Sequence, residues 1–155
     1  MSRRYKRKRL RPLARDVGSV VLAKLTNYLM VDGKKCVASK LLSHSLNCIR
    51  RSLAINPIKV LYEALDNVTP FSEVRSKKVG GVSYQVPIDV PSERRLSLAL
   101  KWLVASARRR KEANMWARLA QEIIDSALAH SLTCKKSQTV RELVFANQAF
   151  AHLGW

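Results

Sequence analysis

The sequence predicts a mainly α fold, a six-helix bundle with one extended β-hairpin that follows a disordered basic N-terminal arm. Three observations predict this fold class. Apolar residues recur at helical spacing over most of the chain, and they alternate strictly only near the middle. Hydrophobic residues make up 47% of the 155 residues, which is enough for one core. We therefore expect a single helical domain at residues 16–155, with its hairpin at about residues 72–90.

The basic arm is predicted from residues 1–15, which contain eight basic residues and no acidic residue. Such a block repels itself and buries no apolar surface, so it is expected to be disordered alone. It could be a solubilising tail, an organelle-targeting peptide or an arm that binds nucleic acid. A targeting peptide would be rich in Ser, so we favour the binding arm. Its expected contacts are Arg3, Arg4, Lys6, Arg7, Lys8, Arg9 and Arg11.

Three helices are predicted before the hairpin. Apolar spacing gives a first helix at about residues 17–31, which Gly33 then caps. A second helix follows and ends at Asn56 and Pro57. Asn56 can cap the next helix, and Pro57 is tolerated at a first helical position. The third helix is short and ends before Pro70.

The hairpin is predicted from the alternation of apolar and polar residues at 82–90, directly after Gly80 and Gly81. Two glycines accept the positive φ angles of a two-residue hairpin turn. A two-stranded ribbon is marginally stable by itself, so it must lean on the helices or on a partner. The resulting register places Val79 opposite Val82, Lys77 opposite Tyr84, and Arg75 opposite Val86.

Three more helices are predicted after the hairpin. The fourth starts near Ser92, and the fifth follows Asn114. The sixth is expected at about residues 139–149, with an apolar stripe of Val140, Leu143 and Val144.

The net charge indicates the class of partner. Lys and Arg number 29 against 11 Asp and Glu, which gives +18 and a sequence pI of about 10.6. Such a charge favours a polyanionic partner, nucleic acid first and an anionic membrane second. No run of 18 apolar residues is present, so we expect no membrane span. The three cysteines have irregular spacing and are expected to be reduced thiols.

The fourth helix has the clearest pattern for phosphate binding. Arg94, Lys101 and Arg108 are seven residues apart and share one stripe, and the helix ends in four consecutive basic residues. One or two bases would satisfy the helix dipole, so the row favours a phosphate backbone. The expected contacts are Arg94, Arg95, Lys101, Arg108, Arg109, Arg110 and Lys111.

The ribbon allows two interpretations. Arg75, Lys77 and Lys78 beside Tyr84 combine charge with a flat ring, which suits clamping a backbone and stacking a base. Lysines also keep a solvated edge strand from aggregating. The spacing alone leaves both interpretations open.

Metal and catalytic sites are not predicted. Cys36, His44 and Cys48 fall on one helix without a nearby fourth ligand. The chain has no Gly-rich phosphate loop and no nucleophile elbow. We therefore expect no cofactor, no metal and no enzymatic activity.

Several longer motifs resemble one family, small-subunit ribosomal protein seven. They are residues 1–4 (MSRR), 29–35 (LMVDGKK), 73–87 (EVRSKKVGGVSYQVP), 99–103 (ALKWL) with the basic run after it, and 146–152 (ANQAFAH). The motifs follow the order of the family and span nearly the whole chain. The chain is thus identified from its sequence as a member of this family.

The resemblance implies a structural constituent of the small ribosomal subunit that binds the 3′ major domain of rRNA and nucleates assembly of the head. It implies rRNA contacts by the arm, by Lys34 and Lys35, by the base of the hairpin and by the fourth helix. It also implies neighbouring ribosomal proteins nine, eleven and thirteen, and no membrane. The hairpin tip would lie near the exit-site tRNA and the mRNA path, through Val79, Gly80, Gly81, Val82 and Tyr84.

The resemblance leaves the compartment and one alternative open. The stretch at residues 140–145 (VRELVF) departs from the family pattern, which favours an organellar, preferably mitochondrial, ribosome over a bacterial cytoplasmic one. A free-standing nucleic-acid-binding regulator would need a dimer face or base-reading residues, and an RNA-modifying enzyme would need a catalytic motif. The sequence shows no clear set of either kind.

Overall fold

The computed structural model describes residues 17–153, and in this part the chain forms six α-helices, one 3₁₀ helix and one two-stranded antiparallel hairpin. The predicted fold class is confirmed for these residues, while the basic arm predicted at residues 1–15 lies outside them. The elements in chain order are α1 (Val17–Leu29), α2 (Lys35–Leu53), α3 (Pro57–Val68), β1 (Ser72–Val79), β2 (Val82–Asp89), α4 (Ser92–Arg109), α5 (Met115–Ala127), α6 (Leu132–Ala146) and η1 (Gln148–Leu153).

The hydrophobic core lies between α1, α2, α3, α4 and α5. α5 packs against α2, α3 and α4, so it is the central element of the bundle. Its Leu119 and Ile123 are fully buried, as are Leu100 and Leu103 on α4. These residues recur at helical spacing, which is why the sequence pattern located the first five helices.

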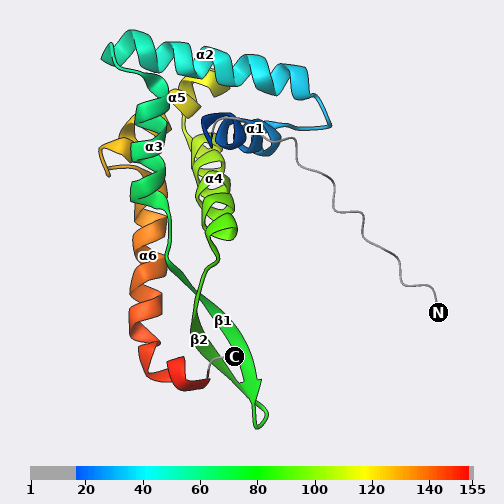
Figure 1. Cartoon of the computed structure of the whole chain (residues 1–155), viewed down its shortest axis with the longest axis vertical. Helices are drawn as coiled ribbons and strands as arrows, with labels where there is room; N and C mark the ends of the chain where they lie inside the picture. The colour runs from blue at the N-terminus through cyan, green and yellow to red at the C-terminus, as the bar shows by residue number, and fades with distance from the viewer. Residues whose placement is uncertain (1–16, 154–155) are drawn as a thin grey trace, which may run out of the picture.

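The molecule is elongated, with different elements at its two ends (Figure 1). α2 lies across one end, and the hairpin projects at the other. α6 runs alongside β1, and η1 packs against β2. α4 connects the two ends, because it begins directly after the hairpin and ends beside α5.

The hairpin has the predicted register, with Val79 opposite Val82, Lys77 opposite Tyr84 and Arg75 opposite Val86. Gly80 and Gly81 form the turn with φ angles of +57° and +85°. A Cβ atom at either glycine would meet no atom within 4 Å, so the tip stands clear of the described residues.

The sixth helix differs from the prediction, since it begins at Leu132 and ends at Ala146, before the separate helix η1. The Ser131 side chain caps it by accepting a hydrogen bond from the Cys134 amide at 3.0 Å. Its buried residues are the polar Thr133 and Ser137, whereas Leu143 is 51% exposed. The early turns were missed because a polar buried face has no apolar period to detect.

The start of α3 provides a test of local stability. The Asn56 side chain accepts a hydrogen bond from the Ile58 amide at 3.0 Å, while Asn114 occupies the same position before α5 without such a bond. Asn56→Ala is expected to lower the free energy of unfolding by about 1 kcal/mol. Asn114→Ala is the matched control and should cost less. Urea denaturation compares the two, and an equal loss would show that the Asn56 cap contributes nothing specific.

Candidate nucleic-acid interface

The junction of α1 and α2 presents two free lysines, Lys34 in the loop and Lys35 as the first residue of α2. Asp32 and Gly33 both have positive φ, at 52° and 72°, which turns the chain sharply after α1. The backbone then closes through a 3.0 Å hydrogen bond from the Lys34 amide to the Val31 carbonyl. The side chains of Lys34 and Lys35 are exposed, and neither has a hydrogen bond or ion pair among the described residues. Both are therefore available to phosphate groups.

The predicted stripe on α4 is exposed, and each member also touches another part of the protein. Arg94 forms an ion pair with Glu73 at 3.0 Å. The ammonium of Lys101 lies 5.8 Å from the centre of the Tyr28 ring, and Arg108 donates a 3.4 Å hydrogen bond to the Tyr28 carbonyl. The stripe thus follows the end of α1 and the root of the hairpin, and these contacts fix its side chains.

The basic run at the end of α4 divides into two kinds of residue. Arg109 and Lys111 are exposed and have no partner among residues 17–153. Arg110, which the sequence assigned to RNA, instead forms ion pairs with three carboxylates. Since its planar group is already occupied, we assign Arg110 a structural role and leave phosphate binding to its neighbours.

The carboxylates around Arg110 include a fully buried one. Glu122 on α5 accepts a 2.7 Å hydrogen bond from Arg110 and a 2.6 Å hydrogen bond from the Thr133 hydroxyl on α6. Glu112 and Asp125 complete the cluster at 2.9 and 2.8 Å. Partial burial disfavours the charged guanidinium, but the three carboxylates outweigh it and raise the pKa of Arg110 above its ordinary value. The cluster ties together the end of α4, the middle of α5 and the start of α6.

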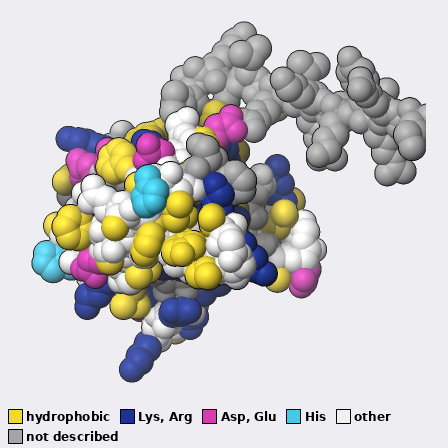
Figure 2. All heavy atoms as spheres, turned by 90° about the horizontal axis from the view of Figure 1, so that it is seen from below, with side chains coloured by type: hydrophobic (Ala, Val, Ile, Leu, Met, Phe, Trp, Pro, Cys, Tyr) yellow, Lys and Arg dark blue, Asp and Glu magenta, His cyan; other side chains and the backbone are white. Residues whose placement is uncertain are grey.

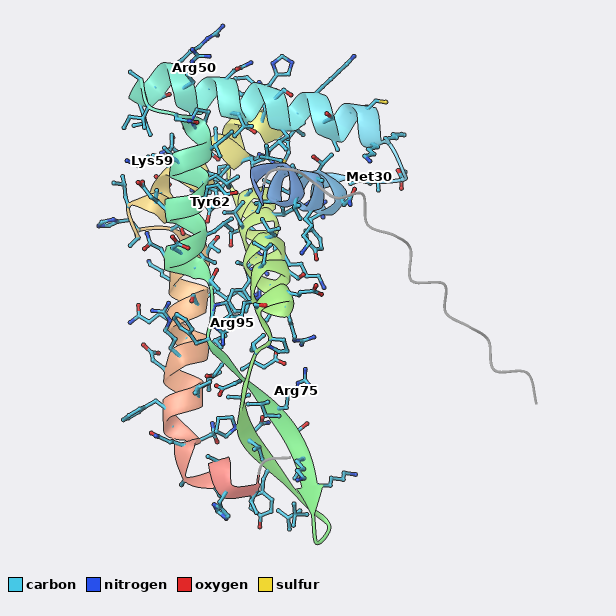
Figure 3. All side chains as sticks on the ribbon, viewed as in Figure 1. Met30, Arg50, Lys59, Tyr62, Arg75 and Arg95 are labelled. Carbon is cyan, nitrogen blue, oxygen red and sulfur yellow. The ribbon has the colours of Figure 1, made fainter. Side chains whose placement is uncertain are left out.

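A second ion-pair cluster holds the root of the hairpin. Glu73 pairs with Arg75 at 2.7 Å and with Arg94 at 3.0 Å, so the carboxylate bridges β1 and α4. Burial opposes ionisation of Glu73, yet the hydrogen bonds from Arg94 and Arg75 prevail and lower its pKa. Arg95 also acts here, because it donates a 2.6 Å hydrogen bond to the Val90 carbonyl and lies over the Phe71 ring. Figure 3 places Arg75 on the ribbon and Arg95 near the start of α4.

The ribbon leans on the last helical turn of the described chain. The Tyr84 ring lies 5.5 Å from the Phe150 ring, and the Lys77 ammonium donates a 2.8 Å hydrogen bond to the Leu153 carbonyl. Lys77 and Tyr84 therefore serve at least in part to attach the ribbon to η1. Lys78 is exposed and without a partner in the described part of the chain.

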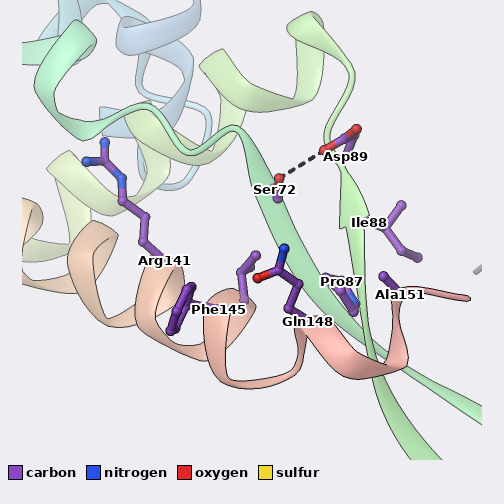
Figure 4. Close-up of a pocket in the computed structure, with 9 residues that line it drawn as sticks. Ser72, Pro87, Ile88, Asp89, Arg141, Phe145, Gln148 and Ala151 are labelled. Carbon is purple, nitrogen blue, oxygen red and sulfur yellow. Dashed lines mark hydrogen bonds between the residues drawn. The ribbon is translucent and has the colours of Figure 1, made fainter.

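A pocket of about 470 Å³ opens where the ribbon meets α6 and η1 (Figure 4). Pro87 and Ile88 line one side, and Phe145 and Gln148 line the other. Phe145 is 78% exposed. Figure 2 views the molecule from this end and shows hydrophobic side chains gathered across its centre, with Lys and Arg in separate groups around them. The hairpin end thus offers apolar surface as well as charge.

Basic residues outside the predicted set are also exposed. The side chains of Lys40, Arg50 and Arg51 on α2 form no hydrogen bond or ion pair among residues 17–153. The signal that could have found the α2 bases is the absence of any Asp or Glu from that helix. Figure 3 shows Arg50 near the end of α2 and Lys59 near the start of α3.

The described part of the chain shows neither a metal cluster nor a membrane span. Among residues 17–153, no three His, Cys, Asp or Glu side chains lie together as metal ligands would. None of the described helices combines the length and the apolar character that crossing a bilayer requires.

Comparisons with known proteins agree with the motifs. Residues 1–148 match the family described as ribosomal protein S7p/S5e. The chain is 41% identical over 157 residues to small ribosomal subunit protein uS7 of Ruegeria pomeroyi, with both chains fully covered. It is 42% identical over 154 residues to uS7 of Pseudothermotoga lettingae, covering 98% of this chain and 99% of the relative. These relatives are bacterial, so they do not support the expected mitochondrial location.

The Glu73 cluster predicts a pH dependence of stability. Because the folded protein holds the pKa of Glu73 below its ordinary value near 4.5, the carboxylate contributes stability above that pH. This contribution is lost as the pH falls through the lower, folded pKa. Glu73→Gln should lower the free energy of unfolding at pH 7 and reduce its change between pH 5 and pH 3.

Urea denaturation across this pH range measures the effect. The control is Glu63→Gln, which alters an exposed carboxylate that has no ion pair among the described residues. If both variants show the same acid dependence as the unmodified chain, the cluster does not couple β1 to α4 energetically.

Proposed function

Because the chain belongs to the S7p/S5e ribosomal protein family, it is a structural, non-enzymatic constituent of the small ribosomal subunit that binds rRNA, and we propose that it nucleates assembly of the head. The rRNA segment proposed is the 3′ major domain. The observation that carries the proposal is a set of exposed bases near the start of α2 and the end of α4 whose side chains have no partner among the described residues, namely Lys34, Lys35, Arg109 and Lys111.

The proposed rRNA contacts fall into two groups. Lys34, Lys35, Arg109 and Lys111 supply free charge, while Arg94, Lys101 and Arg108 supply charge whose position is fixed by Glu73 and Tyr28. Fixed donors lose less side-chain entropy on binding phosphate, and free ones adapt to the RNA. The seven bases named for residues 3–11 belong to the same proposal and lie outside the described residues.

The hairpin tip is proposed to lie near the exit-site tRNA and the mRNA path. Val79 and Val82 are 40% and 54% exposed, and a Cβ atom at Gly80 or Gly81 between them would meet no atom within 4 Å. Exposed apolar residues at a projecting loop favour a contact surface. The apolar surface around Leu143 and Phe145 supports the further proposal of contacts with ribosomal proteins nine, eleven and thirteen.

The mitochondrial location expected from residues 140–145 stays a prediction. It concerns the part of α6 where Leu143 and Phe145 are exposed rather than in the core. A different neighbouring protein in the assembled subunit could therefore contact Leu143 and Phe145 without altering the packing of the helical core.

The salt dependence of rRNA binding tests the main proposal. The affinity K falls as salt rises, so the slope of log K against log salt is negative. For each phosphate-binding base that a variant removes, the magnitude of this slope should decrease by roughly 0.7–0.9. Arg109→Ala with Lys111→Ala should therefore reduce it by about 1.4–1.8 in a filter-binding titration with a head-domain transcript. Lys59→Ala with Lys135→Ala removes the same charge elsewhere and should leave the slope unchanged. Equal slopes for the unmodified chain, the α4 variant and the control variant would contradict the proposed contact between α4 and rRNA.

Shortening the ribbon tests the tip separately. A variant that joins Lys77 to Tyr84 through a new turn keeps the contacts to η1, so subunits should still assemble. Subunits with the shortened ribbon should show lower occupancy of the exit-site tRNA or more reading-frame errors. Subunits with Ser83→Ala are the control for both measurements. Assembly with normal tRNA occupancy and fidelity would show that Gly80 and Gly81 serve only the turn.

A further inference from the structure

A second basic surface lies on α2, away from the contacts proposed above. The nineteen residues of α2 contain four Lys or Arg and no acidic residue, and only Lys35 among them is used by the α1–α2 loop. Two of the others, Lys40 and Arg51, are exposed and unpaired within the described chain. A helix that needed charge only for solubility would be expected to carry both signs.

The spacing along α2 places four polar residues in one row. Its buried residues are Ala38, Leu42, Ser45 and Ile49. Moving each position by two residues turns it about 200° around the helix, to the outer side. The residues found there are Lys40, His44, Asn47 and Arg51, which we call the α2 row. Figure 1 shows α2 at one end of the molecule, so its outer side faces away from the bundle.

The α2 row is long enough to follow several nucleotides. Lys40 and Arg51 are eleven positions apart, which corresponds to about 17 Å along the helix axis. The two ends are cationic and the middle is formed by His44 and Asn47, whose side chains can donate hydrogen bonds. A row of this composition matches phosphates and sugars more closely than it matches an apolar protein surface.

An aromatic ring stands at the edge of the row. Trp116, at the start of α5, is 37% exposed and faces a pocket of about 410 Å³. The same pocket is lined by His44, Asn47, Cys48, Arg51 and Ser52. A flat ring that lines the same pocket as a guanidinium is a usual combination for stacking an unpaired base.

We propose that the α2 row and Trp116 form a second RNA-binding surface, at which the backbone of an unpaired rRNA segment follows Lys40 to Arg51 and one base stacks on Trp116. This proposal rests on the proposed rRNA function and adds a contact to it. The surface and the α4 contacts then lie on different elements, so the protein can hold two rRNA segments relative to each other.

The experiment uses the full chain with Trp102→Phe and Trp155→Phe, which leaves Trp116 as the single tryptophan. Adding a head-domain transcript should quench its fluorescence. Lys40→Ala with Arg51→Ala should abolish most of the quenching and reduce the salt slope of binding by about 1.4–1.8. In the otherwise unmodified chain, Trp116→Leu should weaken binding roughly 5- to 150-fold. Lys59→Ala with Lys135→Ala is the control of equal charge and should leave the quenching and the slope unchanged.

The outcomes separate this proposal from the main one. If Arg109→Ala with Lys111→Ala reduces the slope while the α2 variants change neither slope nor quenching, the α2 surface does not bind RNA and the main proposal stands. If no variant changes the slope, both proposals fail. If Trp116 responds only when other small-subunit proteins are added, its partner is a protein and the proposal is wrong. Thermal unfolding of each variant confirms that the fold is kept.

Discussion

The buried carboxylate of Glu122 is the constraint on which much of the structure depends. A charge with no exposure must be paired, and removing one partner of such a pair costs about 3–5 kcal/mol. Its partners are Arg110, directly after α4, and Thr133, in the first turn of α6. The directions of α4 and α6 are therefore both fixed relative to α5. α4 ends in the basic run, and α6 packs against the hairpin. One buried carboxylate therefore helps to position both the basic run and the hairpin.

The few acidic residues explain how a chain of charge +18 stays folded with its bases on the surface. Glu73 and three other carboxylates are gathered at two junctions between elements: Glu73 pairs with two arginines at one, and the three others surround Arg110 at the second. The bases that remain, such as Lys34 and Arg109, are exposed and unpaired among the described residues. Folding thus pairs some arginines within the protein and leaves others, such as Arg109, unpaired among the described residues and available to RNA.

The sequence predicted the first five helices and the register of the hairpin because their signals are local: apolar period, glycine turn and cap. It could not tell which arginines are paired within the protein, since Arg94 meets Glu73 and Arg110 meets Glu122 through the fold. It misplaced α6 because the buried face there is formed by Thr133 and Ser137. The α2 row could have been found from spacing, but its outward direction depends on which face the bundle buries.

The hairpin shows how a polar ribbon is held in place by contacts with helices. Two strands alone bury too little to be stable, and Val86 is fully buried only because other elements cover it. Glu73 fixes the root to α4, and η1 fixes the middle through Phe150 and the Leu153 carbonyl. Since η1 follows α6, and α6 is held by Glu122, the tip is connected to the buried ion pair through a continuous set of packed elements. The exposed valines at the turn are thus presented at a defined distance and direction from the α4 bases.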